Sequence, residues 1–352
     1  MTRTIDRPLL EARTMIRHIL AAFVLVAATG LGASAAMAQE LRLDPAKVVG
    51  PTACGDCHEA SIAAWRDTHH FATFKDMPRT SEARSIADKM GIKRIKAEGD
   101  CVSCHFTSKL DEGKPETIGG ITCESCHGAG KDWIEVHSDF GGKDATAETE
   151  SEAHRKARWA QSEAAGMIRP GDLYALAENC YQCHTVPKED LVNTGGHPAG
   201  SNFELVAWSQ GEVRHNVWYN DAASNAEATQ NRKRLMFLVG QALDLEYALR
   251  GVAKATAKAK YAVEMAKRAK RSALRIKAIS DTGVAIPEVA ALLKIAGSAK
   301  VSLNNEAALT AAADKVAEQA KSIASNYDGS ELAALDGLLP SADAYKGKVY
   351  TP

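Results

Sequence analysis

The alternation of apolar and polar positions is clearest in the last third of the chain. Between residues 231 and 280, apolar side chains recur at the three-to-four-residue spacing of one helix face, which predicts one or two long helices. They are Leu235, Leu238, Val239, Ala242, Leu245, Leu249 and Val252. The turn-forming triplet at 281–283 follows, and Pro287 then suits the first turn of a new helix. A further helix is predicted after Asn304, which would act as its cap, and runs to Asn326.

The preceding region shows no such long pattern. Up to about residue 220 the sequence is rich in turns, with short helices predicted at 61–75, 82–90 and 150–165 and almost no strand-like alternation. This region has few Val, Ile and Phe residues, so it has little apolar surface from which to build a core. The sequence therefore predicts a mainly α fold with little regular strand, in which something other than side chains fills the first part.

The beginning of the chain resembles a targeting segment. Arg13, Arg17 and His18 precede an apolar run, and small residues then offer a cleavage site after Ala38. The alternative is an uncleaved membrane anchor, because residues 19–38 are about long enough to span a bilayer. We predict a signal peptide at 1–38, a periplasmic protein, a first domain at 39–229 and a helical bundle or interaction domain at 230–352.

Charge is divided unevenly between these two parts. Residues 39–229 contain 20 Lys and Arg against 30 Asp and Glu, whereas residues 230–352 contain 19 against 12. An acidic part joined to a basic part predicts electrostatic orientation of a protein partner, or self-association through the C-terminal helices. The alternative is a solvated basic helix face. Nothing in the sequence indicates a nucleic-acid partner.

The chemistry of the first domain is carried by one motif, Cys-x-x-Cys-His, which occurs four times. The motifs begin at Cys54, Cys101, Cys123 and Cys180, and together they use all eight cysteines of the chain. Their second cysteines are Cys57, Cys104, Cys126 and Cys183, and their histidines are His58, His105, His127 and His184. Two thiols three positions apart on a helical turn lie on one side of the backbone.

This arrangement is typical of c-type haem attachment. The two thiols add to the two vinyl groups of one haem, and the adjacent histidine reaches the iron. Disulfides suit an exported protein, but they would leave the histidine after every pair unexplained. Four such pairs are not a zinc-ribbon pattern, and the βαβ context of a thioredoxin-like motif is missing. The sequence therefore predicts four covalently attached haem c groups, which would also fill the weak core.

The sixth coordination position of each iron separates two functions. A haem whose iron is closed by a second side chain passes electrons, whereas an open iron can bind and transform small molecules. Apart from His18 and the four motif histidines, six remain: His69, His70, His137, His154, His197 and His215. Four haems need at most four of them, so the number of histidines neither requires nor excludes an open site.

The order of the motifs resembles a known family. After the first motif comes WRDTHH, then CVSCH, then GGITCESCHGAG with a histidine about ten residues later, and then the fourth motif. This order is similar to that of the tetrahaem cytochrome c that accepts electrons from hydroxylamine oxidoreductase in ammonia-oxidising bacteria, and of its multihaem relatives. The resemblance covers residues 50–220 approximately, and the helical region after 230 lies outside it.

The resemblance implies a set of second ligands. His70, five residues after Trp65, would serve the fourth haem, His137 the first and His215 the third. In the family the second haem, here the one held by Cys101, Cys104 and His105, has no second protein ligand.

His197, in GGHPAG, has no counterpart in the family pattern. It could close the second haem, replace His215 on the third, or be an ordinary loop histidine. We predict a periplasmic electron carrier between redox partner proteins rather than an enzyme. The alternative is a reductase of nitric oxide or a similar nitrogen or sulfur species at an open second haem, with charged residues beside that motif as proton donors. A docking subunit of a larger complex is compatible with electron transfer.

Overall fold

A computed structural model describes residues 43–352, and the predicted signal segment with its cleavage site lies outside them. The prediction of a mainly α fold with little strand is confirmed, since the described residues contain many helices and one two-stranded sheet. The helices of the motif-bearing part are α2 (Pro51–Gly55), α3 (Glu59–Arg66), α4 (His69–Asp76), α5 (Ser81–Lys89), α6 (Asp100–His105), α7 (Cys123–His127), α8 (Ile134–Ser138), α9 (Glu152–Ala164), α10 (Leu173–His184), α11 (Glu189–Asn193) and α12 (Leu205–Ser209).

The single helix predicted at 61–75 is in fact two, α3 and α4. The break falls at Asp67 and Thr68, where the Thr68 side chain accepts a hydrogen bond from the Phe71 backbone N–H and caps α4. A threonine that caps a new helix competes with continuation of the old one. The break lets His69 and His70 begin a helix in a new direction. The other short helices, α5 and α9, lie within two residues of their predicted positions.

The only sheet among the described residues is a short antiparallel hairpin. Strand β1 (Thr107–Asp111) pairs with β2 (Lys114–Gly119), and Gly113 at φ +78° turns the chain between them. The hairpin joins the end of the second motif to the start of the third. The Thr107 hydroxyl donates to the Gly120 carbonyl over 2.9 Å, so the base of the hairpin is anchored where the third motif begins.

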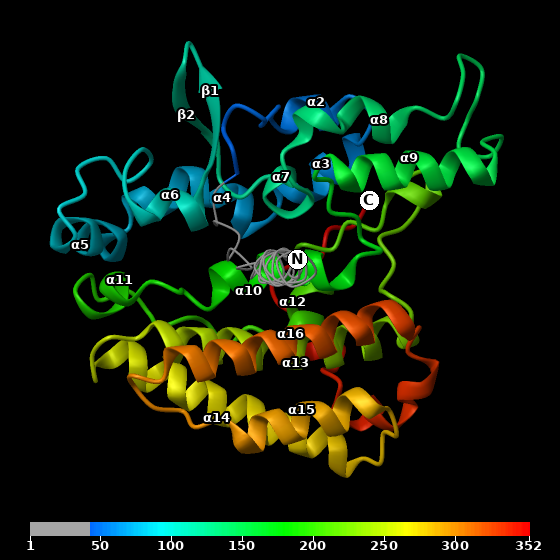
Figure 1. Ribbon diagram of the computed structural model, residues 1–352. Coiled ribbons are helices and arrows are strands. Elements are labelled where there is room, and N and C mark those ends of the chain that lie inside the picture. The colour runs from blue at the N-terminus through cyan, green and yellow to red at the C-terminus, as the bar shows by residue number, and fades with distance from the viewer. Residues whose placement is uncertain (1–42) are drawn as a thin grey trace, which may run out of the picture. The chain divides into compact units, whose positions relative to one another are not determined.

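The C-terminal part consists of four long helices. They are α13 (Gln230–Lys254), α14 (Lys260–Asp281), α15 (Pro287–Ser298) and α16 (Glu306–Asn326). Helix α13 packs against α16 and α14, and α15 packs against α14 and α16 (Figure 1). All seven apolar positions of the predicted stripe on α13 are buried. Because other helices also cover its remaining faces, α13 buries the polar side chains Gln241, Asp244 and Glu246 as well.

The start of α16 differs by one residue from the prediction. Asn305, not Asn304, occupies the cap position, and its side chain makes no capping hydrogen bond. Asn304 adopts a left-handed conformation at φ +58°, which asparagine tolerates better than most residues. It therefore turns the chain into the helix rather than capping it. Pro287 does open α15, as predicted.

The motif-bearing part and the helical part share one core. The described residues, 43–352, all fall in one compact unit. Helix α10, which carries the fourth motif, packs directly on α13, and its buried Tyr174 donates to Glu246 of α13 over 2.9 Å. One contiguous apolar cluster includes residues from Leu173 to Leu335. The two-domain division near residue 229 stays a prediction about independent folding, because packing across it is continuous.

In residues 43–352 no helix combines the length and the apolar character needed to cross a membrane.

Candidate functional site

Each Cys-x-x-Cys-His motif lies on a short helical turn. The histidines of the second, third and fourth motifs are the last residues of α6, α7 and α10, and His58 stands at the cap position of α3. Helical backbone brings cysteines at i and i+3 to one face. Local structure thus presents two thiols and one imidazole together at all four motifs, as covalent attachment of haem requires.

The fold brings every motif histidine opposite a second histidine. The four pairs, with the distances between ring centroids, are His58 and His137 at 6.3 Å, His70 and His184 at 6.4 Å, His105 and His197 at 6.3 Å, and His127 and His215 at 6.2 Å. When two imidazoles bind one metal ion, the distance between their ring centroids is the sum of two metal–nitrogen bonds of about 2 Å and the distance from nitrogen to centroid in each ring. This sum is about 6 Å. All four pairs have the separation of two ligands on one iron.

Hydrogen bonds hold five of these rings through the same nitrogen. The Nδ1 atoms lie near backbone carbonyl oxygens in four cases: His127 to Ile168 at 3.0 Å, His137 to Ile134 at 2.5 Å, His197 to Pro198 at 2.8 Å and His215 to Val213 at 2.8 Å. In the fifth, Nδ1 of His184 lies 3.2 Å from the Ser201 hydroxyl. A metal-ligating histidine commonly donates its other ring N–H in this way. With Nδ1 occupied, Nε2 is the atom left for iron.

Burial keeps the motif imidazoles in the neutral form that binds metal. Burial, followed by the influence of His197 and then His70, lowers the pKa of His105 to about 4. Burial, followed by His70 and then Arg268, lowers the pKa of His184 to about 4 as well. Burial is also the main cause of the lowered pKa values of His58 and His127. At neutral pH these rings are unprotonated, and the neutral ring is the ligand.

The remaining two histidines face carboxylates instead. Nδ1 of His69, whose side chain is 87% exposed, lies 2.7 Å from Glu212, and Nδ1 of His154 lies 2.7 Å from Glu150. Neither has a motif histidine opposite it within the described structure. The six spare histidines thus divide into four that face a motif histidine and two that contact a carboxylate.

Trp65 and Gly120 explain how His70 is positioned. The indole N–H of Trp65 donates to the Ile121 carbonyl over 2.8 Å, and the Ile121 N–H donates to the His70 carbonyl over 3.1 Å. A Cβ atom at Gly120 would come within 2.2 Å of that His70 oxygen. Only glycine allows so close an approach of the two backbones. The segment before the third motif therefore fixes the histidine that faces the fourth.

A buried ion pair positions His137. Arg158 of α9 donates to the His137 carbonyl over 2.6 Å, and its guanidinium pairs with Glu150 at 2.5 Å. Hydrogen bonds from Arg158, and to a lesser extent from His154, lower the pKa of Glu150 to about 2. The guanidinium also stacks over Trp159 at 4.1 Å. Sequence reasoning missed this support, because the residues are recognisable only once α8 and α9 are packed together.

Acid should weaken this support in a defined range of pH. Because the Glu150 pKa is depressed, the pair stabilises the fold fully above the usual carboxyl pKa of about 4.3 and loses that contribution as pH falls through about 2. We expect Glu150→Gln to lower the thermal unfolding midpoint at pH 7, and the difference from wild type to shrink between pH 5 and pH 2. The exposed Glu152→Gln is the matched control. A difference independent of pH would contradict this account.

Several buried hydrogen-bond donors lack an acceptor in the described chain. They include Nε1 of Trp133, Nε1 of Trp208 and Nε of Arg214, whose Nη1 has only the distant Glu227 carboxylate at 3.8 Å. Each lies beside a paired histidine: the Trp133 ring is 5.2 Å from His137, the Trp208 ring is 4.9 Å from His184, and Arg214 precedes His215. Buried donors are normally satisfied. Haem carries two propionate carboxylates, so the positions of these donors fit that group.

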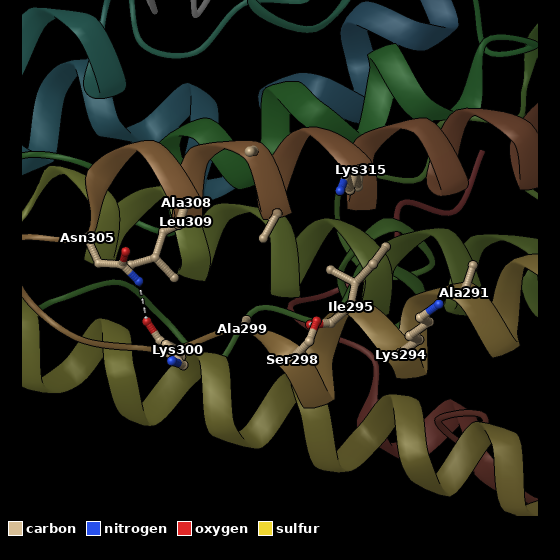
Figure 2. A pocket seen from close by; sticks show the side chains of 12 residues that line it. Ala291, Lys294, Ile295, Ser298, Ala299, Lys300, Asn305, Ala308, Leu309 and Lys315 are labelled. Carbon is tan, nitrogen blue, oxygen red and sulfur yellow. Dashed lines mark hydrogen bonds between the residues drawn. The ribbon is translucent and has the colours of Figure 1, made fainter.

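Two other kinds of site receive no such support. Within residues 43–352, no group of three or more His, Cys, Asp or Glu side chains comes together as a conventional metal site would require. A hollow of about 730 Å³ between α15 and α16 is lined by alanines, Ile295, Leu309 and three lysines among others (Figure 2). It contains no cysteine or histidine, so it is separate from the paired rings.

Comparison with known proteins finds one family and one curated relative. Residues 53–128 match the family described as cytochrome c554 and c-prime. This segment is similar to cytochrome c554. Over 144 residues the chain is 28% identical to cytochrome c-554 of Nitrosomonas europaea, which covers 38% of this chain and 56% of that protein. The chain thus spans about half the length of this curated relative. No solved structure matches the chain.

The match to cytochrome c554 confirms two predictions. The resemblance inferred from motif order is confirmed, and so is the cofactor, covalently attached haem c. The four motifs account for four haem groups. The family match ends at residue 128 and does not reach the fourth motif or the helices after 230.

Proposed function

We propose that this protein is an electron-transfer cytochrome in which each of four haem c groups is held between two histidines. The observation that carries the proposal is the set of four histidine pairs, each with centroids 6.2–6.4 Å apart. When bound, the haem iron supplies a one-electron redox centre. Two imidazole ligands keep its coordination unchanged between the oxidised and reduced states, which suits a carrier.

The ligand set follows from the pairs. His137 serves the first haem with His58, His197 the second with His105, His215 the third with His127, and His70 the fourth with His184. Three of these second ligands are those that the family resemblance implies. The fourth, His197, departs from the family pattern and closes the second haem. This arrangement favours electron transfer over the alternative of a reductase, since that reaction needs an open iron.

Contacts between motifs support an order of electron passage. The side chain of Cys54 lies close to that of Cys123, and the side chain of Cys104 lies close to that of Cys183. The side chain of Asn179, next to the fourth motif, donates to the Cys126 carbonyl over 2.9 Å. The first motif is thus adjacent to the third, the third to the fourth and the fourth to the second. Electrons would enter at one end of this series and leave at the other.

The cellular setting is part of the same proposal. An exported c-type cytochrome would work in the periplasm between redox partner proteins. The excess of acidic residues at 39–229 and of basic residues at 230–352 supports docking oriented by charge. On α14, Lys270 and Arg271 are exposed. We propose that the exposed side of this helix binds a partner protein or a second copy of the chain.

Low-temperature EPR of the oxidised protein, quantified against a haem count, tests the function. We expect low-spin signals that account for four haems per chain, because two nitrogen ligands on every iron give a strong field. A high-spin signal approaching one haem per chain would show an open iron. The reductase would then be the favoured function.

A further inference from the structure

A line of polar contacts connects the helical part of the chain to the fourth motif. Arg268 of α14 pairs with Asp244 of α13 at 2.6 Å, and their side chains are 5% and 3% exposed. The same guanidinium donates to the Ser201 carbonyl over 3.0 Å. The Ser201 hydroxyl in turn lies 3.2 Å from Nδ1 of His184. Arg268 thus stands two contacts away from His184, and Asp244 three.

Ser201 is fixed to His184 at two points. Its hydroxyl faces the ring, and its backbone N–H donates to the His184 carbonyl over 2.9 Å. Gly200, at φ +83°, makes this approach possible, because a Cβ there would come within 2.9 Å of both that carbonyl oxygen and the Arg268 guanidinium. When Nε2 binds iron, Nδ1 carries the proton, so the ring donates to the Ser201 oxygen.

The surroundings of His184 differ from those of the other held rings. His127, His137, His197 and His215 each have a backbone carbonyl as the Nδ1 partner. His184 has a hydroxyl, with a buried cation behind it. The ring of Phe203 stacks on that of His184, with the centroids 4.7 Å apart.

We propose that Ser201, Arg268 and Asp244 are positioning residues that set the reduction potential of the fourth haem. The helical region would then act as a tuning element for one redox centre, in addition to any docking role. The proposal rests on the proposed histidine ligation and assigns a purpose to a buried ion pair that packing alone does not require.

The expected directions follow from charge. A hydrogen bond from Nδ1 makes the imidazole a stronger donor to iron, which stabilises the oxidised state and lowers the potential. A nearby positive charge disfavours the oxidised state, which carries one more positive charge, and raises the potential; a negative charge does the reverse. In the native pair these two effects oppose each other.

Ser201→Ala is the first variant to test. It removes the acceptor, so we expect the potential of one haem to rise, changing its oxidised-to-reduced ratio severalfold at a fixed electrode potential; tenfold corresponds to about 59 mV for one electron. Ser201→Thr keeps the hydroxyl and should restore the native value. The measurement is a potentiometric titration followed by EPR, which resolves the haems separately.

The charged residues provide a second test, because structural damage alone would not shift the potential in opposite directions in two variants. Arg268→Gln removes the cation and should lower the potential of the same haem, whereas Asp244→Asn removes the anion and should raise it. Ser272 and Arg275, which also contact Asp244, are unchanged in both variants. Ser322→Ala, which removes a hydrogen bond to Glu288 elsewhere in the helical part, is the matched control and should move no haem.

Opposite shifts of one haem in the two charge variants would support the proposal. Unchanged titrations in Ser201→Ala and in both charge variants would overturn it, as would equal shifts of all four haems or shifts of the same sign. Failure of this inference is distinguishable from failure of the proposed function. If the wild type has four low-spin haems but the variants leave the reduction potential of the fourth haem unchanged, only the tuning role is refuted. If the wild type contains high-spin iron, the proposed histidine ligation itself is refuted.

Discussion

His197→Ala should convert one of the four haems from low-spin to high-spin iron. The substitution removes the only ring that faces His105 in the proposed pairing, at 6.3 Å. The loop should keep its shape, because the His197 N–H donates to the Leu191 carbonyl over 3.1 Å and Lys260 donates to the His197 carbonyl over 3.2 Å. Both contacts use backbone atoms of residue 197 and survive the change. The expected EPR spectrum therefore has three low-spin haems and one high-spin haem per chain.

His69→Ala is the matched control for this experiment. It removes an equally sized ring beside His70, but one that is 87% exposed and pairs with Glu212. We expect four low-spin haems to remain. Four low-spin haems in His197→Ala would show that another group closes the second haem, and a high-spin signal in the control would show that the assignment of His69 and His70 is reversed.

The His197→Ala protein also separates the two functions. An iron with one open position can bind small molecules such as carbon monoxide in its reduced state, whereas the wild type should not. A single loop histidine would thus decide between a carrier and a site capable of small-molecule chemistry. Sequence reasoning left three roles open for His197, because nothing local to GGHPAG indicates which ring it faces.

The parts of the site that could be predicted are those encoded over a few residues. The Cys-x-x-Cys-His motifs need only one helical turn, so their chemistry is readable from spacing. The stripe on α13 was likewise predictable, since all its positions belong to one helix face. The second ligands come from positions far along the chain from their partners. His70, His137 and His215 were reached only through the family resemblance.

The supporting contacts could not be predicted, for the same physical reason. Ser201 meets Arg268 across 67 positions, and Arg268 meets Asp244 across 24. Serine and arginine are common residues, and no local pattern distinguishes these from others in the chain. Only the packing of α14 on α13 places them beside the fourth motif. The break between α3 and α4 was missed for another reason. Apolar spacing alone does not reveal that Thr68 caps a new helix.

Removing the first three haems should unfold residues 43–170 and leave the rest folded. The shared apolar cluster extends from Leu173 to Leu335. Before it, the described residues that are buried and apolar are few: Val48, Ile62, Ala64, Ala87, Phe106 and Trp133. Each contributes at most about 3 kcal/mol, whereas ordering the backbone costs about 1–2 kcal/mol for every residue. Without the macrocycles, this segment cannot offset the entropy of folding.

The test is a variant in which the six cysteines of the first three motifs are alanine, examined by amide hydrogen exchange. We expect rapid exchange in α4, α7 and α9 and native protection in α13 and α16. The matched control replaces Cys180 and Cys183 alone. Helix α10 should then remain protected, because Tyr174 binds Glu246 and Tyr247 binds Glu178 across the contact with α13. If the six-cysteine variant lost protection throughout, the chain would be one cooperative unit; if it kept protection throughout, haem would not form the core of the first part.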